Sequence, residues 1–96
     1  MATMRFGQIA SDPPTTTVKF RSYRLFEVLD EELREYKDYG NRHESANAAQ
    51  RKAKDTFPEI AAWWVNRNVG AHGCLQTQFY CIETRTTRVL RIMGVR

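Results

Sequence analysis

Apolar residues recur at the helical period between Ser45 and Phe57. Ala46, Ala49, Ala53 and Phe57 fall on one side of a helix, and polar or charged residues occupy the opposite side. Ser45 is a residue type that caps helix N-termini, and the proline directly after Phe57 disfavours helical geometry there. The pattern therefore predicts a helix over 45–57. Because its alanines are small, we expect this helix to lie close against a β-sheet.

The segment 18–29 alternates in the way expected of a strand. Val18, Phe20, Phe26 and Val28 share one parity, and we expect them to face the core. The other parity is half polar, as in a strand with one side in water. It carries Lys19, Arg21, Tyr23, Leu25, Glu27 and Leu29.

The segments 74–83 and 88–93 are predicted to form a β-hairpin about a turn at Arg85–Thr86. This register combines an apolar face, a charge pair and a cation–π pair. It places Glu83 opposite Arg88, Cys81 opposite Leu90, Phe79 opposite Ile92 and Tyr80 opposite Arg91.

Two shorter segments are compatible with a helix or with a strand. Over 30–40, Asp30 is a candidate N-cap and Gly40 a candidate left-handed stop, which favours a helix. Over 58–66, Pro58 suits the first position of a short helix, but the apolar run that follows also suits a strand. We therefore predict one or two short helices besides the main one.

The chain has 96 residues, which fits one domain. A proline pair followed by three threonines favours a flexible N-terminal tail over 1–17, ahead of a single α+β domain over 18–96. The expected sheet comes from 18–29 and 74–93, with the helix packed across it. We found no apolar run that would span a membrane and no N-terminal signal for secretion, so we expect no membrane partner and a cytoplasmic location.

The net charge of +4 is unevenly distributed. Residues 31–44 carry three basic and five acidic side chains, whereas residues 45–96 carry eight basic and three acidic ones. A basic half of this kind suits contact with phosphate groups if the cations share a face.

No pattern of catalytic or metal-binding residues is present. His43, His72, Cys74 and Cys81 are ligand types for zinc, but the two cysteines are seven residues apart on a predicted strand and point to opposite faces. The histidine at 72 lies close to Cys74, but no third orienting group accompanies the pair. We therefore expect no metal, no cofactor and no enzymatic activity.

Binding of a protein or a nucleic acid is the function that remains. The two adjacent tryptophans cannot both enter one core from a strand, and an exposed one would suit a partner or a base. The candidate binding residues are basic or aromatic: Arg21, Tyr23, Arg24, Arg51, Lys54, Trp63, Trp64, Arg67, Tyr80, Arg88 and Arg91.

The arrangement of strand, S-A-x-A-A helix ending in F-P, aromatic segment and basic hairpin resembles small accessory proteins of bacteriophages. It is similar in type to inhibitors of CRISPR effector complexes. The matching positions are Ser45, Ala46, Ala49, Ala53, Phe57 and Pro58. The resemblance implies a binder that blocks a host protein or nucleoprotein complex, in the cytoplasm of the host.

Many such inhibitors carry dense negative charge, and this basic chain departs from that pattern. The alternatives are a small protein that binds DNA or RNA directly and a viral structural or assembly protein.

Overall fold

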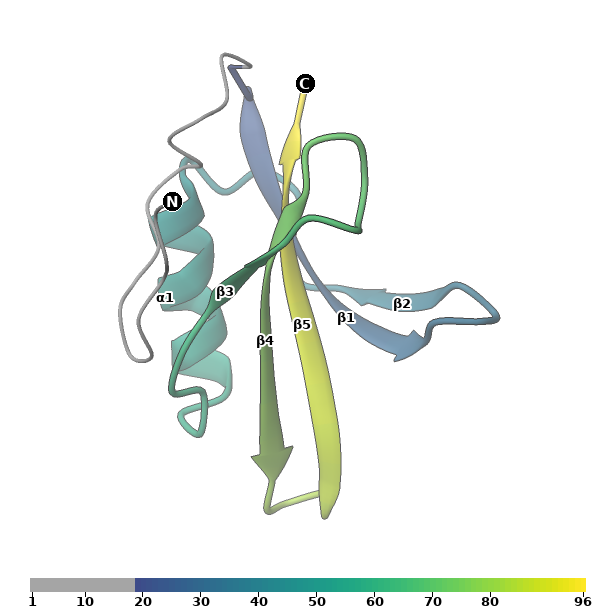
Figure 1. Ribbon diagram of the computed structural model, residues 1–96. Helices are drawn as coiled ribbons and strands as arrows, with labels where there is room; N and C mark the ends of the chain where they lie inside the picture. The colour runs from purple at the N-terminus through teal and green to yellow at the C-terminus, as the bar shows by residue number, and fades with distance from the viewer. Residues whose placement is uncertain (1–18) are drawn as a thin grey trace.

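The chain folds into a five-stranded antiparallel sheet with one helix across one face (Figure 1). The computed structural model describes residues 19–96, so the predicted tail at 1–17 lies outside the described residues. The elements in chain order are β1 (Ser22–Asp30), β2 (Glu35–Asp38), α1 (Ala46–Thr56), β3 (Trp64–Asn66), β4 (Cys74–Cys81) and β5 (Thr86–Val95). The strand order is β2-β1-β5-β4-β3. The predicted α+β class is confirmed.

The main helix forms where the alanine pattern placed it. Ser45 caps α1, because its Oγ accepts a hydrogen bond of 3.0 Å from the backbone N–H of Ala48. Ala46, Ala49 and Ala53 are each at most 1% exposed, so the helix backbone comes close to the sheet. The core between α1 and the sheet contains the alanine stripe and larger apolar side chains from the strands and the segment after α1. These are Tyr23, Leu25, Phe57, Ile60, Trp63, Leu75, Phe79, Leu90 and Ile92.

The prediction of further short helices is wrong. The segment 30–40 is a turn followed by β2. Asp30 does act as a cap, since its carboxylate accepts the backbone N–H of Leu33 at 2.9 Å, but the bond closes a turn between two strands. Arg34 has a φ of 54°, which a right-handed helix does not allow. The open alternative at 58–66 resolves as a turn leading to β3, which pairs with β4.

The prediction of which residues in 18–29 face the core holds only in part: Val18 lies outside the described residues, Phe20 packs against the core, and Val28 is half-buried. Tyr23 and Leu25 are the β1 side chains in the core under α1. Phe26, on the opposite face, is buried against Tyr36 of β2, with ring centroids 5.3 Å apart. The alternation of apolar residues did not identify the core face, because both faces of β1 are covered. Helix α1 covers one face, and the Tyr36 side chain of β2 covers Phe26 on the other. Phe20 precedes β1 and packs at the margin of the core.

Strands β4 and β5 form the predicted hairpin in a different register. The turn occupies residues 82–85, so Phe79 lies opposite Arg88 and Ile92 lies opposite Leu75. Each residue meets a partner four positions earlier than predicted. Because this shift is even, every side chain keeps its predicted face, and Phe79 and Ile92 both belong to the core. Arg85, with a φ of 57°, closes the longer turn.

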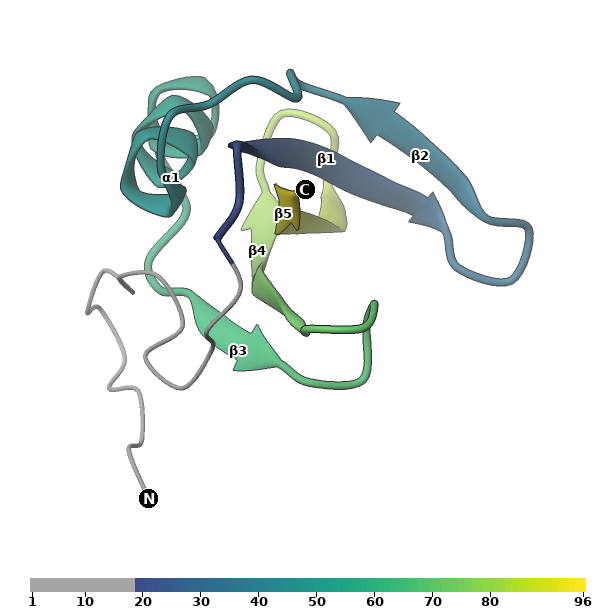
Figure 2. The ribbon, with the colours of Figure 1, turned by 90° about the horizontal axis from the view of Figure 1, so that it is seen from above.

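The view from above shows α1 on one side of the sheet, while the β1–β2 hairpin and the loop after β3 project on the other side (Figure 2). Within residues 19–96, no helix is long and apolar enough to cross a membrane.

Candidate binding groove

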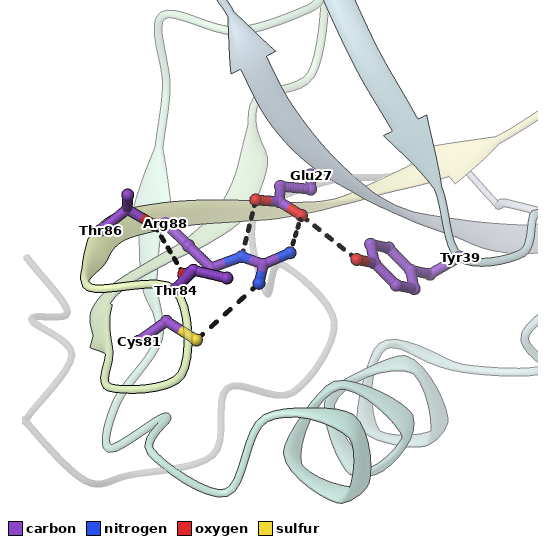
Figure 3. Close-up of polar contacts among 6 residues, drawn as sticks. All are labelled: Glu27, Tyr39, Cys81, Thr84, Thr86 and Arg88. Carbon is purple, nitrogen blue, oxygen red and sulfur yellow. Dashed lines mark hydrogen bonds and ion pairs between the residues drawn. The ribbon is translucent and has the colours of Figure 1, made fainter.

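Arg88, a predicted binding residue, forms an ion pair inside the fold. Its Nε and Nη2 donate to the two carboxylate oxygens of Glu27 at 2.9 and 2.7 Å, and Tyr39 also donates to that carboxylate (Figure 3). The guanidinium carbon lies 4.6 Å from the ring centroid of Phe57. The hydrogen bonds to Glu27 raise the pKa of Arg88. The predicted pairing of Arg88 with Glu83 is therefore wrong, because the register places the guanidinium beside β1.

Arg91 is also engaged within the fold. It is 7% exposed, and its Nη2 and Nη1 donate to the carboxylate of Glu31 at 2.6 and 3.1 Å, while Nε donates to Gln76. The side-chain hydrogen bond from Arg91 lowers the pKa of Glu31. The predicted cation–π pair with Tyr80 is wrong, since Tyr80 lies opposite Thr87 and is 56% exposed.

Three candidate binding residues near the start of β1 lie in different environments. Tyr23 belongs to the core under α1. Arg24 donates to Asp38 at 2.7 Å and stacks over Phe26 on the opposite face. Arg21 is exposed, just before the strand begins. These three side chains therefore do not form one binding surface.

Three predicted binding residues do come together, in a groove of about 330 Å³ between α1 and the segment that follows it. Its apolar part includes Ile60 and Trp63, which are 3% and 5% exposed. Its charged residues lie on α1 and are exposed. The lining residues are Gln50, Arg51, Lys54, Asp55, Ile60, Ala61 and Trp63.

Lys54 determines the shape of this groove. Its Nζ donates to the carbonyl oxygens of Pro58 and Ile60 at 2.7 and 2.5 Å. These bonds tie the turn after α1 back to the helix and hold the ammonium group in a fixed place. Arg51, one turn earlier on α1, makes no ion pair with any residue in 19–96, and its guanidinium is available at the groove.

The other predicted residues lie elsewhere. Trp64 is half-buried in β3 and lies opposite Gln76, whereas Trp63 precedes β3 and belongs to the core under α1. Arg67 is exposed in the loop after β3, and Tyr80 is exposed near the end of β4. None of the three lines the groove.

A second hollow, of about 460 Å³, contains basic residues that sequence reasoning missed. Arg21, Arg42 and Arg96 line it, and only Arg21 had been singled out. These residues come from the start of β1, the segment before α1 and the end of β5. No local pattern joins them. The pairing of the start of β1 with the end of β5 brings them together, and the sequence pattern of the β4–β5 hairpin does not predict that pairing.

The described residues show no assembled metal centre, because no group of three or more His, Cys, Asp or Glu side chains in 19–96 could hold an ion. Cys74 and Cys81 are buried free thiols. Burial raises the pKa of Cys74 to about 11, whereas hydrogen bonds at Thr84 lower the pKa of Cys81. His43 Nε2 lies 3.3 Å from the backbone oxygen of Tyr39.

No protein-family model, no curated protein and no solved structure matches this chain. The comparisons therefore supply no relative from which a role could be carried over.

Proposed function

We propose that this protein is a non-catalytic binding protein and that the groove beside α1 receives a segment of a partner protein. One observation carries the proposal: the groove combines the apolar side chains of Ile60, Ala61 and Trp63 with the charged groups of Arg51 and Lys54. Apolar surface of this kind supplies binding energy, and a few charged groups beside it fix the orientation of what binds.

The occupant that fits this chemistry is a short segment with an apolar side chain next to a carboxylate. Burying one apolar side chain fully stabilises a complex by about 1.5–3 kcal/mol. An exposed ion pair between Arg51 and a carboxylate adds only about 0–1 kcal/mol. The apolar contact therefore supplies most of the affinity, whereas Arg51 selects acidic over basic segments. Asp55, on the same side of the helix, opposes a second carboxylate there.

The partner that we propose is a host nucleoprotein complex of the CRISPR effector type, bound and blocked through an acidic part of one of its protein subunits. The support for this class is the resemblance of the chain to small phage accessory proteins, together with the positive charge of the groove. Binding of this kind needs no chemistry from the inhibitor itself. A role in assembly of a virus particle stays a prediction, and no feature of the groove favours it.

Direct nucleic-acid binding through the cations that the sequence singled out has less support. Arg24, Arg88 and Arg91 each form an ion pair within the fold. Lys54 is bound to two carbonyl oxygens. A phosphate group would have to compete with these partners for the same donors.

The test uses purified CRISPR effector complexes of several types, each immobilised and exposed to the protein in biolayer interferometry. Arg51→Glu reverses the charge at the groove, and Ala61→Glu adds bulk and a carboxylate among its apolar residues. Lys52→Glu is the matched control, because Lys52 is exposed on the other flank of α1 and does not line the groove.

We expect one type of complex to bind the wild-type protein, with an affinity that falls at least tenfold in both groove variants and less than threefold in the control. Circular dichroism and a thermal melt establish that the variants are folded. If no complex binds, the proposed partner class is wrong. If binding survives Arg51→Glu and Ala61→Glu unchanged, the groove is not the binding surface.

A further inference from the structure

The hollow at the end of the sheet brings three arginines together from distant parts of the chain. Arg21 precedes β1, Arg42 lies in the segment before α1, and Arg96 follows β5. All three are exposed. The other lining residues are Ser22, Asn41 and Val95.

Backbone hydrogen bonds hold these segments in place. Ser22 lies opposite Val95 in the sheet, and the N–H of Arg21 donates to the oxygen of Val95 at 2.8 Å. Tyr23 and His43 exchange backbone hydrogen bonds of 2.9 and 3.1 Å. In addition, Ser22 Oγ donates to the backbone carbonyl oxygen of Asn41 at 2.9 Å. The backbone around the arginines is thus organised before any ligand arrives.

The charge of this hollow differs from that of the rest of the sheet. The arginines of β1 and β5, Arg24, Arg88 and Arg91, each have a carboxylate partner. In the described part of the chain, Arg21 and Arg42 have none, and no Asp or Glu side chain lines the hollow.

Nearby negative groups do not cancel this charge. Glu44, two residues after Arg42, does not line the hollow. A free carboxylate on the main chain of Arg96 would cancel one of the three charges and leave the hollow positive. Like charges gathered in one place repel each other, and an anion relieves that repulsion.

We propose that this hollow binds the phosphodiester backbone of a nucleic acid. Guanidinium groups match the geometry of phosphate oxygens and donate two hydrogen bonds at once. The site is open and its three cations lie on separate segments, which suits successive phosphates along a strand better than one enclosed ion. Among the described residues, its lining offers no aromatic platform, so it contacts the backbone and does not read sequence. The hollow is separate from the groove beside α1, because the two share no lining residue within 19–96.

The experiment measures fluorescence anisotropy of a labelled 20-nucleotide single-stranded DNA of mixed sequence, titrated with the full chain at several salt concentrations. The variants are Arg21→Gln, Arg42→Gln and the double variant. The matched control is Arg85→Asn in the β4–β5 turn, at the opposite end of the molecule from the start of β1 (Figure 1). It removes one exposed positive charge, and asparagine tolerates the positive φ at this position.

Each phosphate contact contributes about 0.7 to the slope of log K against log salt for a single strand. Each arginine substitution should therefore lower the slope by about 0.7 and weaken binding about fivefold at 0.1 M salt, and the double variant should lose about 25-fold. Arg85→Asn should change the affinity by less than twofold. Binding should be insensitive to base sequence.

Several results would overturn the inference. One is a double variant that binds DNA as well as the wild type. Another is a control that weakens binding as much as Arg21→Gln, which would indicate diffuse attraction to the whole basic surface. A third is equal competition by a polyglutamate peptide of matched charge, or complete competition by millimolar inorganic phosphate, which would show a general anion site. Groove variants such as Ala61→Glu should leave DNA binding unchanged, so failure here is distinct from failure of the proposed function.

Discussion

The buried ion pair between Glu27 and Arg88 offers the sharpest test of how the fold is held together. The side chains of Arg88 and Glu27 are 17% and 6% exposed, and they join β5 to β1 across the face covered by α1. Glu27→Gln keeps the size and shape of the side chain but removes its negative charge. Among the described residues, Arg88 then keeps the introduced amide oxygen, Cys81 Sγ and the Phe57 ring beside its guanidinium, but no carboxylate.

Removing one member of a buried pair destabilises a protein by about 3–5 kcal/mol, because the remaining charge is left without compensation. This is a large part of the 5–15 kcal/mol that typically separates folded from unfolded states. Urea unfolding followed by tryptophan fluorescence measures the change. With a slope of about 1–3 kcal/mol per molar urea, the midpoint should fall by at least about 1 M.

The exposed pair between Arg24 and Asp38 provides the control. Its side chains are 38% and 60% exposed, so Asp38→Asn should lower stability by about 1 kcal/mol or less. Replacing both members of the buried pair, as Glu27→Leu with Arg88→Met, should restore most of the loss, since no charge remains to be compensated. If Glu27→Gln destabilises the protein no more than Asp38→Asn, the reasoning about burial is refuted.

Two further predictions concern other contacts. Because Arg91 lowers the pKa of Glu31, this pair stabilises the fold above the unfolded pKa of about 4.3 and stops doing so as the pH falls through the lower folded value. The difference in free energy of unfolding between wild type and Glu31→Gln, measured by urea titration, is about 1 kcal/mol or less for so exposed a carboxylate. It should be present at pH 7 and absent near about pH 2; a constant difference would contradict this. Ala49→Leu should overpack the contact between α1 and the sheet and lower stability by about 1–3 kcal/mol, whereas Asn47→Leu, on the exposed side of the helix, should not; thermal melts compare the two.

The sequence was informative where the determining contacts are local. The cap at Ser45 and the spacing of the alanines lie within one turn or two of each other, so α1 could be predicted closely. At Asp30 the same kind of signal misled, because a carboxylate that accepts a backbone N–H can close a turn as well as begin a helix. Deciding between them needs the pairing of β2 with β1, which the turn residues alone do not reveal.

The candidate sites were predicted only in part for the same reason. The faces of β4 and β5 followed from alternation, but the register did not, because apolar positions spaced by four residues fit equally well after a slip of four. The partners of Arg88 and Arg91 lie 61 and 60 residues away in the chain. The sequence therefore presents Arg88 and Arg91 as cations that could bind a partner, whereas in the fold each is paired with a carboxylate.

The order of the strands has a consequence for how the chain is made. Strand β5 leaves the ribosome after the other four strands of the sheet, yet it lies in the middle, between β1 and β4. Until it emerges, the β1–β2 hairpin and the β3–β4 pair have no strand to join them, and α1 lacks the central strand of the sheet against which it packs. We therefore expect the sheet to assemble in one late, cooperative step once β5 has emerged, with the unpaired edges of β1 and β4 exposed to chaperones or to self-association until then.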